Sequence, residues 1–64
     1  MKKYYCVTSA FNDRGNVSAA VTDCVNAESK PESTYSATQR ADIYNDWFDN
    51  YRDAQKFVKD TLNA

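Results

Sequence analysis

The sequence predicts a small α+β domain in which a three-stranded antiparallel sheet carries one C-terminal helix on one face. Two segments rich in Val, Thr, Tyr and Phe flank the only glycine of the 64-residue chain, as in a β-hairpin. A third aromatic segment follows a long polar stretch, and the C-terminal residues show helical spacing of apolar side chains. We expect one domain over residues 1–64, made of a hairpin at 3–27, a loop at 28–39, a strand at 41–48 and a helix at 51–63.

The hairpin prediction rests on the turn Asn12-Asp13-Arg14-Gly15, which suits a type I turn with glycine in the left-handed position. With this turn, Asn12 faces Asn16 and Val7 faces Val21. The odd-numbered positions then gather most apolar side chains on one face. We expect this face to be the core: Tyr5, Val7, Phe11, Val17, Val21 and Val25. Asp23 is a charged exception there, and we expect it at a frayed end or a β-bulge.

The even-numbered face of the hairpin carries no charged side chain: Tyr4, Cys6, Thr8, Ala10, Ser18, Ala20, Thr22 and Cys24. Because a solvated sheet face usually presents charged residues, we interpret this face as a contact surface. A homodimer is the commonest form of such contact. The alternative is that Thr, Ser and Tyr are simply good strand residues. Both cysteines lie on this face as diagonal neighbours, where a disulfide would be strained, so we expect free thiols.

Residues 28–39 are polar, contain the only proline and lack periodicity, which predicts a loop. Residues 41–48 fit helical spacing as well, but their aromatic and β-branched side chains disfavour a helix. We therefore predict a strand, in which Ile43 and Trp47 face one way and Tyr44 and Phe48 the other. One pair should pack under the helix and the other should lie on the outer face.

The helix at 51–63 has a clear start signal. Asp49 or Asn50 is a good N-cap, and Asp53 follows Asn50 at capping-box spacing. One face of the helix gathers the apolar side chains Tyr51, Ala54, Phe57, Val58 and Leu62 together with Thr61. The stretch WFDN followed by YRDAQKFV resembles the strand–cap–helix ending of many small proteins encoded by phages and other mobile elements. This resemblance implies no activity.

Residues that carry chemistry are sparse. The chain has no histidine, two cysteines and one glycine, so it lacks the commonest general base, the ligands of a structural zinc site and phosphate-binding glycine loops. We therefore expect no enzymatic activity, no cofactor and no metal. The net charge of −1 argues against a protein that coats nucleic acid or anionic membrane. Because no apolar run suits a signal peptide or a membrane span, we expect a cytoplasmic protein.

These observations predict a non-enzymatic protein-interaction module that binds a protein partner or itself through the outer sheet face. The expected contact residues are Tyr4, Thr8, Thr22, Tyr44 and Trp47. One alternative is an accessory domain associated with nucleic acid, since sheet aromatics can stack on bases. Its basic residues are scattered, however, and aspartates surround the aromatic segment. Another alternative is a small inhibitor from a phage or mobile element that binds a host protein.

Overall fold

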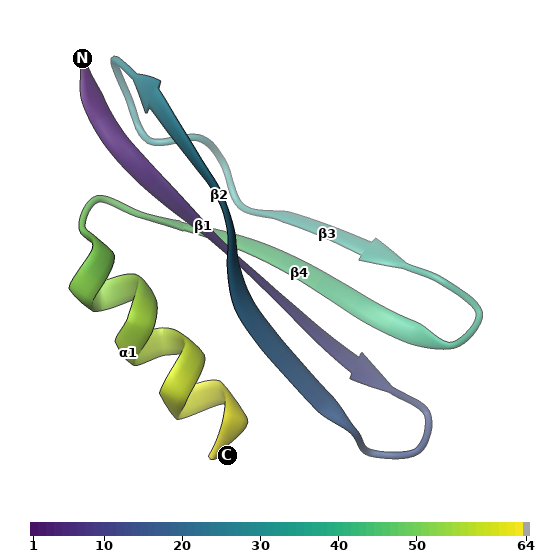
Figure 1. The fold of residues 1–64 in the computed structure, drawn as a ribbon. Helices are drawn as coiled ribbons and strands as arrows, with labels where there is room; N and C mark the ends of the chain where they lie inside the picture. The colour runs from purple at the N-terminus through teal and green to yellow at the C-terminus, as the bar shows by residue number, and fades with distance from the viewer. Residues whose placement is uncertain (64) are drawn as a thin grey trace.

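The computed structural model describes residues 1–63 and has an α+β fold with a four-stranded antiparallel sheet and one helix (Figure 1). The elements are β1 (Lys2–Asn12), β2 (Val17–Ala27), β3 (Thr34–Ala37), β4 (Ala41–Phe48) and α1 (Tyr51–Leu62). The strand order is β2-β1-β4-β3. The α+β class, the hairpin and the strand at 41–48 are confirmed. The three-stranded sheet is wrong, because part of the expected loop forms a fourth strand.

That fourth strand, β3, lies within the polar segment 28–39 and pairs with β4, so that Tyr35 lies opposite Tyr44. The connection to β4 is a tight turn, in which the Thr38 N–H donates to the Ala41 carbonyl at 2.8 Å. The Thr38 hydroxyl in turn accepts from the Ala41 N–H at 3.0 Å. Thr and Tyr favour strands, but β3 has only four residues, too few to show alternation inside a polar stretch.

The turn between β1 and β2 forms as predicted. Gly15 has φ of 80°, a left-handed conformation that costs little without a Cβ, and its N–H donates to the Asn12 carbonyl at 3.1 Å. The Asn12 side chain accepts from the N–H groups of Arg14 and Asn16. The Asn12 N–H donates to the Asn16 carbonyl at 3.1 Å, so these two residues close the hairpin.

The β1–β2 register follows the prediction as far as Val7 opposite Val21 and then shifts by one residue. Thr22 is the extra residue of this β-bulge, next to the charged position expected to be irregular. Beyond the bulge, Tyr5 lies opposite Cys24. Because side chains alternate between the faces, one inserted residue exchanges the faces of everything that follows in β2.

The bulge therefore corrects two predictions about faces. Val25, expected on the core face, lies opposite Tyr4 on the other face of the sheet. Cys24 moves to the face that Tyr5 occupies, whereas Cys6 stays on the opposite face. The expectation that both thiols share a face is wrong, and the two free cysteines differ in environment, since Cys6 is buried and Cys24 is exposed.

The helix α1 begins at its predicted cap. The Asn50 side-chain oxygen accepts from the Asp53 N–H at 2.8 Å, and the Asn50 amide donates to the Asp53 carboxylate at 2.9 Å. This reciprocal contact satisfies one of the free N–H groups of the first helical turn.

The core lies between α1 and one face of the sheet. Tyr5 packs edge-on against Tyr51 with ring centroids 5.4 Å apart, and Phe48 packs against Phe57 at 5.1 Å. Val7, which shares the face of Tyr5, is completely buried. Phe48 therefore lies on the helix side of β4, together with Tyr44. Of the two expected pairs, Tyr44 and Phe48 face the side of α1, and Ile43 and Trp47 face the outer side.

The outer face, opposite α1, is covered at one end by the connection between β2 and β3. These strands lie at opposite edges of the sheet, so residues 28–33 must cross from one edge to the other. Figure 1 shows this connection on the side of β1 away from α1. On that face Tyr4 is only 6% exposed and Cys6 only 4%. Tyr4 and Cys6 on the outer face and Val7 on the helix side are therefore buried, whereas Lys2 and Lys3 at the start of β1 are exposed.

Candidate protein-interaction site

The five contact residues expected from the sequence do not form one surface. Tyr4 is buried, Trp47 and Thr8 are half-buried, and Thr22 is exposed, all on the outer face. Tyr44 lies on the opposite face, because it shares the helix side with Phe48 of the same strand.

Four polar side chains on the outer face form a continuous chain of hydrogen bonds, with one residue from each strand. The hydroxyls of Thr22 and Thr8 are 2.7 Å apart, and Thr8 donates to the Asn45 oxygen at 2.6 Å. The Asn45 amide then donates to the Thr34 hydroxyl at 3.1 Å. Asn45 and Thr34 were not expected at this face from the sequence. The bulge places one charged residue, Asp23, on this face, opposite Cys6. The polar chain explains the uncharged remainder of the hairpin's outer face from within the fold, since its polar groups satisfy one another.

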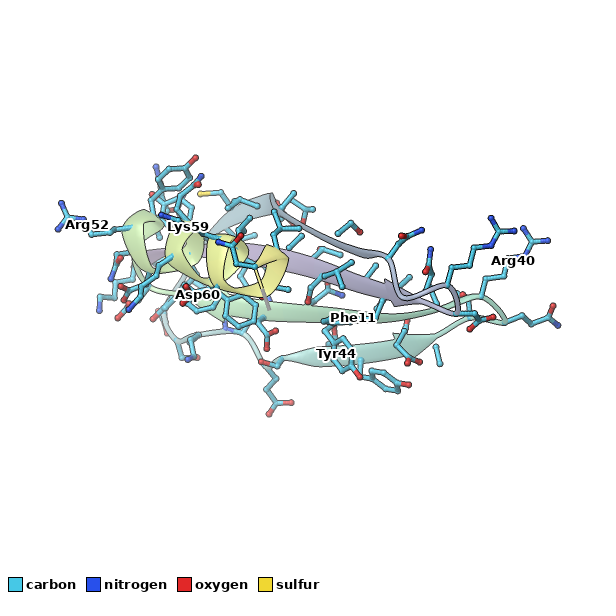
Figure 2. All side chains as sticks on the ribbon, turned by 90° about the horizontal axis from the view of Figure 1, so that it is seen from below. Phe11, Arg40, Tyr44, Arg52, Lys59 and Asp60 are labelled. Atoms are coloured by element: carbon cyan, nitrogen blue, oxygen red, sulfur yellow. The ribbon has the colours of Figure 1, made fainter. Side chains whose placement is uncertain are left out.

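The helix-side face carries an exposed group of rings that we call the aromatic cluster: Phe11, Tyr35 and Tyr44. The ring centroids of Phe11 and Tyr44 are 5.7 Å apart, and those of Tyr35 and Tyr44 are 4.9 Å apart. Their side chains come from β1, β3 and β4 and are 38%, 58% and 37% exposed in chain order. Figure 2 shows Phe11 and Tyr44 beyond the C-terminal end of α1. The helix therefore leaves these rings open to solvent.

An open hollow of about 410 Å³ lies between the aromatic cluster and the last turns of α1. Its lining mixes apolar rings with polar groups: Ser9, Phe11, Tyr44, Asp46, Phe57 and Thr61. From the sequence, Phe11 was expected in the core, and neither Phe57 nor Asp46 was expected as a site residue. The pairing of β1 with β4, which sets Ser9 opposite Tyr44, and the packing of α1 on these strands bring the lining residues together.

Negative charge accompanies the aromatic cluster. Asp46 is half-buried beside the hollow, and the Tyr35 hydroxyl donates to the Asp42 carboxylate at 2.8 Å. This hydrogen bond, with the charge of Asp42, raises the pKa of Tyr35 because both favour the neutral phenol. Within residues 1–63 the one ion pair joins Lys2 to Asp49 at 3.8 Å. Asp42 and Asp46 therefore have no cationic partner within the described part of the chain.

The described residues offer no group of three or more His, Cys, Asp or Glu side chains placed to hold a metal ion. Among residues 1–63, no helix has the length and apolar character needed to cross a membrane. Comparison of the chain with protein family models, curated proteins and solved structures gives no match.

Proposed function

We propose that the chain is a protein-interaction module that binds a partner protein through the aromatic cluster and the hollow beside it. The observation that carries this proposal is the contact of three rings, each more than a third exposed, on a face that α1 otherwise covers. Aromatic side chains supply large contact area at low entropic cost and dominate the energetics of protein interfaces. A small inhibitor that binds a host protein, the alternative drawn from the sequence, would be a special case of such binding.

The chemistry of the site favours a partner that presents a lysine or arginine. The faces of Tyr44 and Phe11 can bind a cation, and the apolar stem of such a side chain can lie against the rings. Asp46 lies at the same hollow and can form a charge-assisted hydrogen bond with the cationic group. The site therefore suits a segment in which Lys or Arg stands beside an apolar residue.

The helix-side face suits this role better than the outer face for two reasons. Tyr4 is buried at one end of the outer face, the face on which residues 28–33 cross between the edges of the sheet. Further along it, Thr8 and Asn45 use their hydrogen-bonding groups on one another. The aromatic cluster has no comparable covering element among residues 1–63, since α1 contacts β1, β2 and β4 but not β3.

A peptide display library selected against the purified chain tests the proposal without a known partner. We expect the selected peptides to contain Lys or Arg next to an apolar residue. Their affinity should fall roughly tenfold in Tyr44→Ser, the loss typical of an interface hot spot, and should also fall in Asp46→Asn. Tyr51→Ser is the matched control, because Tyr51 is an exposed tyrosine on α1 outside the cluster.

Two results would contradict the proposal. One is peptides whose affinity is the same for Tyr44→Ser as for the unaltered chain. The other is a set of selected peptides that lack a cationic residue and lose affinity when a residue of the outer face is substituted, as in Thr22→Lys. Circular dichroism and unfolding of each variant establish that it is folded before its affinity is interpreted.

A second candidate is nucleic-acid binding, and one observation favours it. Arg14 and Arg40 come from the two hairpin turns, which the hydrogen bond from the Asp13 N–H to the Arg40 carbonyl joins at 3.2 Å. Both arginines line one polar hollow, and Figure 2 shows Arg40 at the end of the molecule away from α1. Fluorescence polarisation with labelled single-stranded oligonucleotides tests this candidate. Salt-sensitive binding that Arg14→Gln and Arg40→Gln weaken would support it.

A further inference from the structure

The strand β2 presents a long free edge. It has 11 residues and lies at one edge of the sheet, whereas the opposite edge is the four-residue β3. Natural proteins protect such edges with bulges and charges, and β2 has both at Thr22 and Asp23. The preceding stretch, Val17–Val21, is regular and contains no charged side chain. We call this stretch the open edge.

The hydrogen-bonding direction of the open edge follows from the turn. Because the Asn12 N–H donates to the Asn16 carbonyl, these two residues form a hydrogen-bonded pair. Hydrogen-bonded and non-hydrogen-bonded pairs alternate in an antiparallel ladder, so Ser18 and Ala20 direct their backbone groups toward β1. The residues whose N–H and C=O groups point away from the sheet are Val17, Ala19 and Val21.

We propose that a second copy of this chain pairs with the open edge, β2 against β2 and antiparallel, about a two-fold axis at Ala19. The turn and the bulge bound the open edge on either side, and Ala19 is its centre. Pairing about Ala19 sets Val17 of each copy opposite Val21 of the other. All outward backbone groups of the open edge then find partners, and one patch of surface serves both copies.

The charges next to the open edge fit this register. The open edge of one copy ends at the turn that carries Arg14, and antiparallel pairing places that end beside the bulge of the second copy, next to which Asp23 lies. Symmetry repeats this pairing of opposite charges at the other end. Arg14 and Asp23 are both exposed and form no ion pair within residues 1–63.

The test combines oligomeric state with amide hydrogen exchange. Light scattering coupled to size exclusion, over a wide concentration range, should show a dimer that dissociates on dilution. In the dimer the Ala19 amide should be protected from exchange, and dilution should remove that protection. The Ala20 amide is the internal control, because it faces β1 and should stay protected in both states.

Three variants make the test specific. Ala19→Pro removes an outward N–H that β1 does not use, a position where edge strands tolerate proline, and should give a monomer. Arg14→Glu should raise the dimer dissociation constant roughly tenfold, because two symmetric charge pairs become repulsive. Arg14→Glu/Asp23→Arg reverses both charges and should restore the dimer. These charge variants lie at exposed positions, so they test the register even if Ala19→Pro fails to fold.

A monomer at all concentrations up to the millimolar range would overturn the proposal. So would a dimer in which the Ala19 amide exchanges freely, or one that the double charge reversal fails to restore. Tyr44→Ser separates this inference from the proposed function, because Tyr44 lies on β4, which β1 separates from the open edge on β2. Dimerisation should be unchanged in Tyr44→Ser, and a dimer lost in that variant would assign self-association to the aromatic cluster.

Discussion

Replacing Thr8 by valine tests whether the polar chain on the outer face holds the four strands together. Valine keeps the shape and the strand preference of threonine but replaces the hydroxyl by a methyl group. The substitution removes the hydrogen bonds of Thr8 to Thr22, at 2.7 Å, and to Asn45, at 2.6 Å. Because Thr8 is the link between β2 and β4, its loss divides the polar chain in two.

The magnitude follows from the two bonds and their exposure. A hydrogen bond contributes about 0.5–1.5 kcal/mol net to stability. The bond to Thr22 is exposed, so we place it at the lower limit, whereas the bond to Asn45 is partly buried. We therefore expect Thr8→Val to lower the free energy of unfolding by about 1–2 kcal/mol. Small domains have about 0.05–0.15 kcal/mol of stability per residue, so this loss is a large fraction of the total.

Urea unfolding measures this change through the fluorescence of Trp47, the only tryptophan in the chain. The midpoint of thermal unfolding should fall by about 4–8 °C per kcal/mol lost. All variants are compared at one protein concentration, since self-association would couple stability to concentration. Thr22→Val is the matched control, because it removes only the exposed hydrogen bond and should cost less than Thr8→Val.

An equal or higher stability of Thr8→Val relative to Thr22→Val would refute this reasoning. The hydrogen bond between Thr8 and Asn45 would then contribute nothing to stability. In that case the polar side chains of the outer face would again need another explanation, and contact with a partner would be the first to test.

Two further predictions concern the helix cap and Tyr35. Asn50→Ala removes the side-chain oxygen that accepts from the Asp53 N–H, and we expect it to lower the free energy of unfolding by about 1 kcal/mol. Asn50→Asp, which keeps an acceptor oxygen, should retain most of the stability. Equal losses in both variants would contradict the capping role. Asp42→Asn should lower the raised pKa of Tyr35 toward its ordinary value of about 10, as followed by the NMR shift of the phenol carbon against pH. Because the fold favours the neutral phenol, this contact stabilises the protein below pH about 10 and is lost as the pH rises through the raised pKa; an unchanged titration in Asp42→Asn would show that the contact is absent in solution.

Features set by local chemistry could be predicted from the sequence. The turn needs a left-handed residue, and Gly15 is the only glycine in the chain. The start of α1 needs a cap, and Asn50 provides it three residues before the acidic residue that completes the contact. The strand at 41–48 could be distinguished from a helix because aromatic and β-branched residues dominate it. Each of these decisions depends on a few neighbouring residues.

The bulge at Thr22 shows why the faces beyond it could not be predicted. A single inserted residue leaves the composition of a strand unchanged but exchanges its two faces. The only local signal was Asp23, a charge within an otherwise uncharged strand, and it indicated an irregularity without fixing its position. Cys24 and Val25 were therefore assigned to the wrong faces, although the register before the bulge was right.

The strand β3 was missed because its support comes from a distant part of the chain. Its four residues show too little pattern to stand out from the polar stretch around them. They form a strand because β4 offers them a free edge, with Tyr35 against Tyr44 and Thr34 bonded to Asn45. The polar chain and the aromatic cluster both depend on this pairing, so neither could be found before the strand order was known.

The exposed aromatic cluster follows from a mismatch in size between one helix and four strands. A helix is about 10 Å wide with its side chains, whereas four strands at a spacing of about 4.8 Å set the outer strands about 14 Å apart. One helix therefore cannot cover the whole sheet, and α1 contacts β2, β1 and β4 but not β3. Part of the helix-side face had to remain open on the side of β3 and β4, whatever side chains stood there.

The residues at that open part distinguish a binding surface from a merely uncovered one. A surface with no role would be expected to carry charged or small polar side chains there. The chain instead packs Phe11 and Tyr35 each against Tyr44 on this face, and Asp46 lines the adjoining hollow. On the outer face, by contrast, the uncharged stretch beyond Asp23 has an internal explanation in the polar chain that includes Thr8 and links all four strands. Polar groups that bond to one another need no partner, whereas exposed rings that no element within residues 1–63 covers are better explained by one.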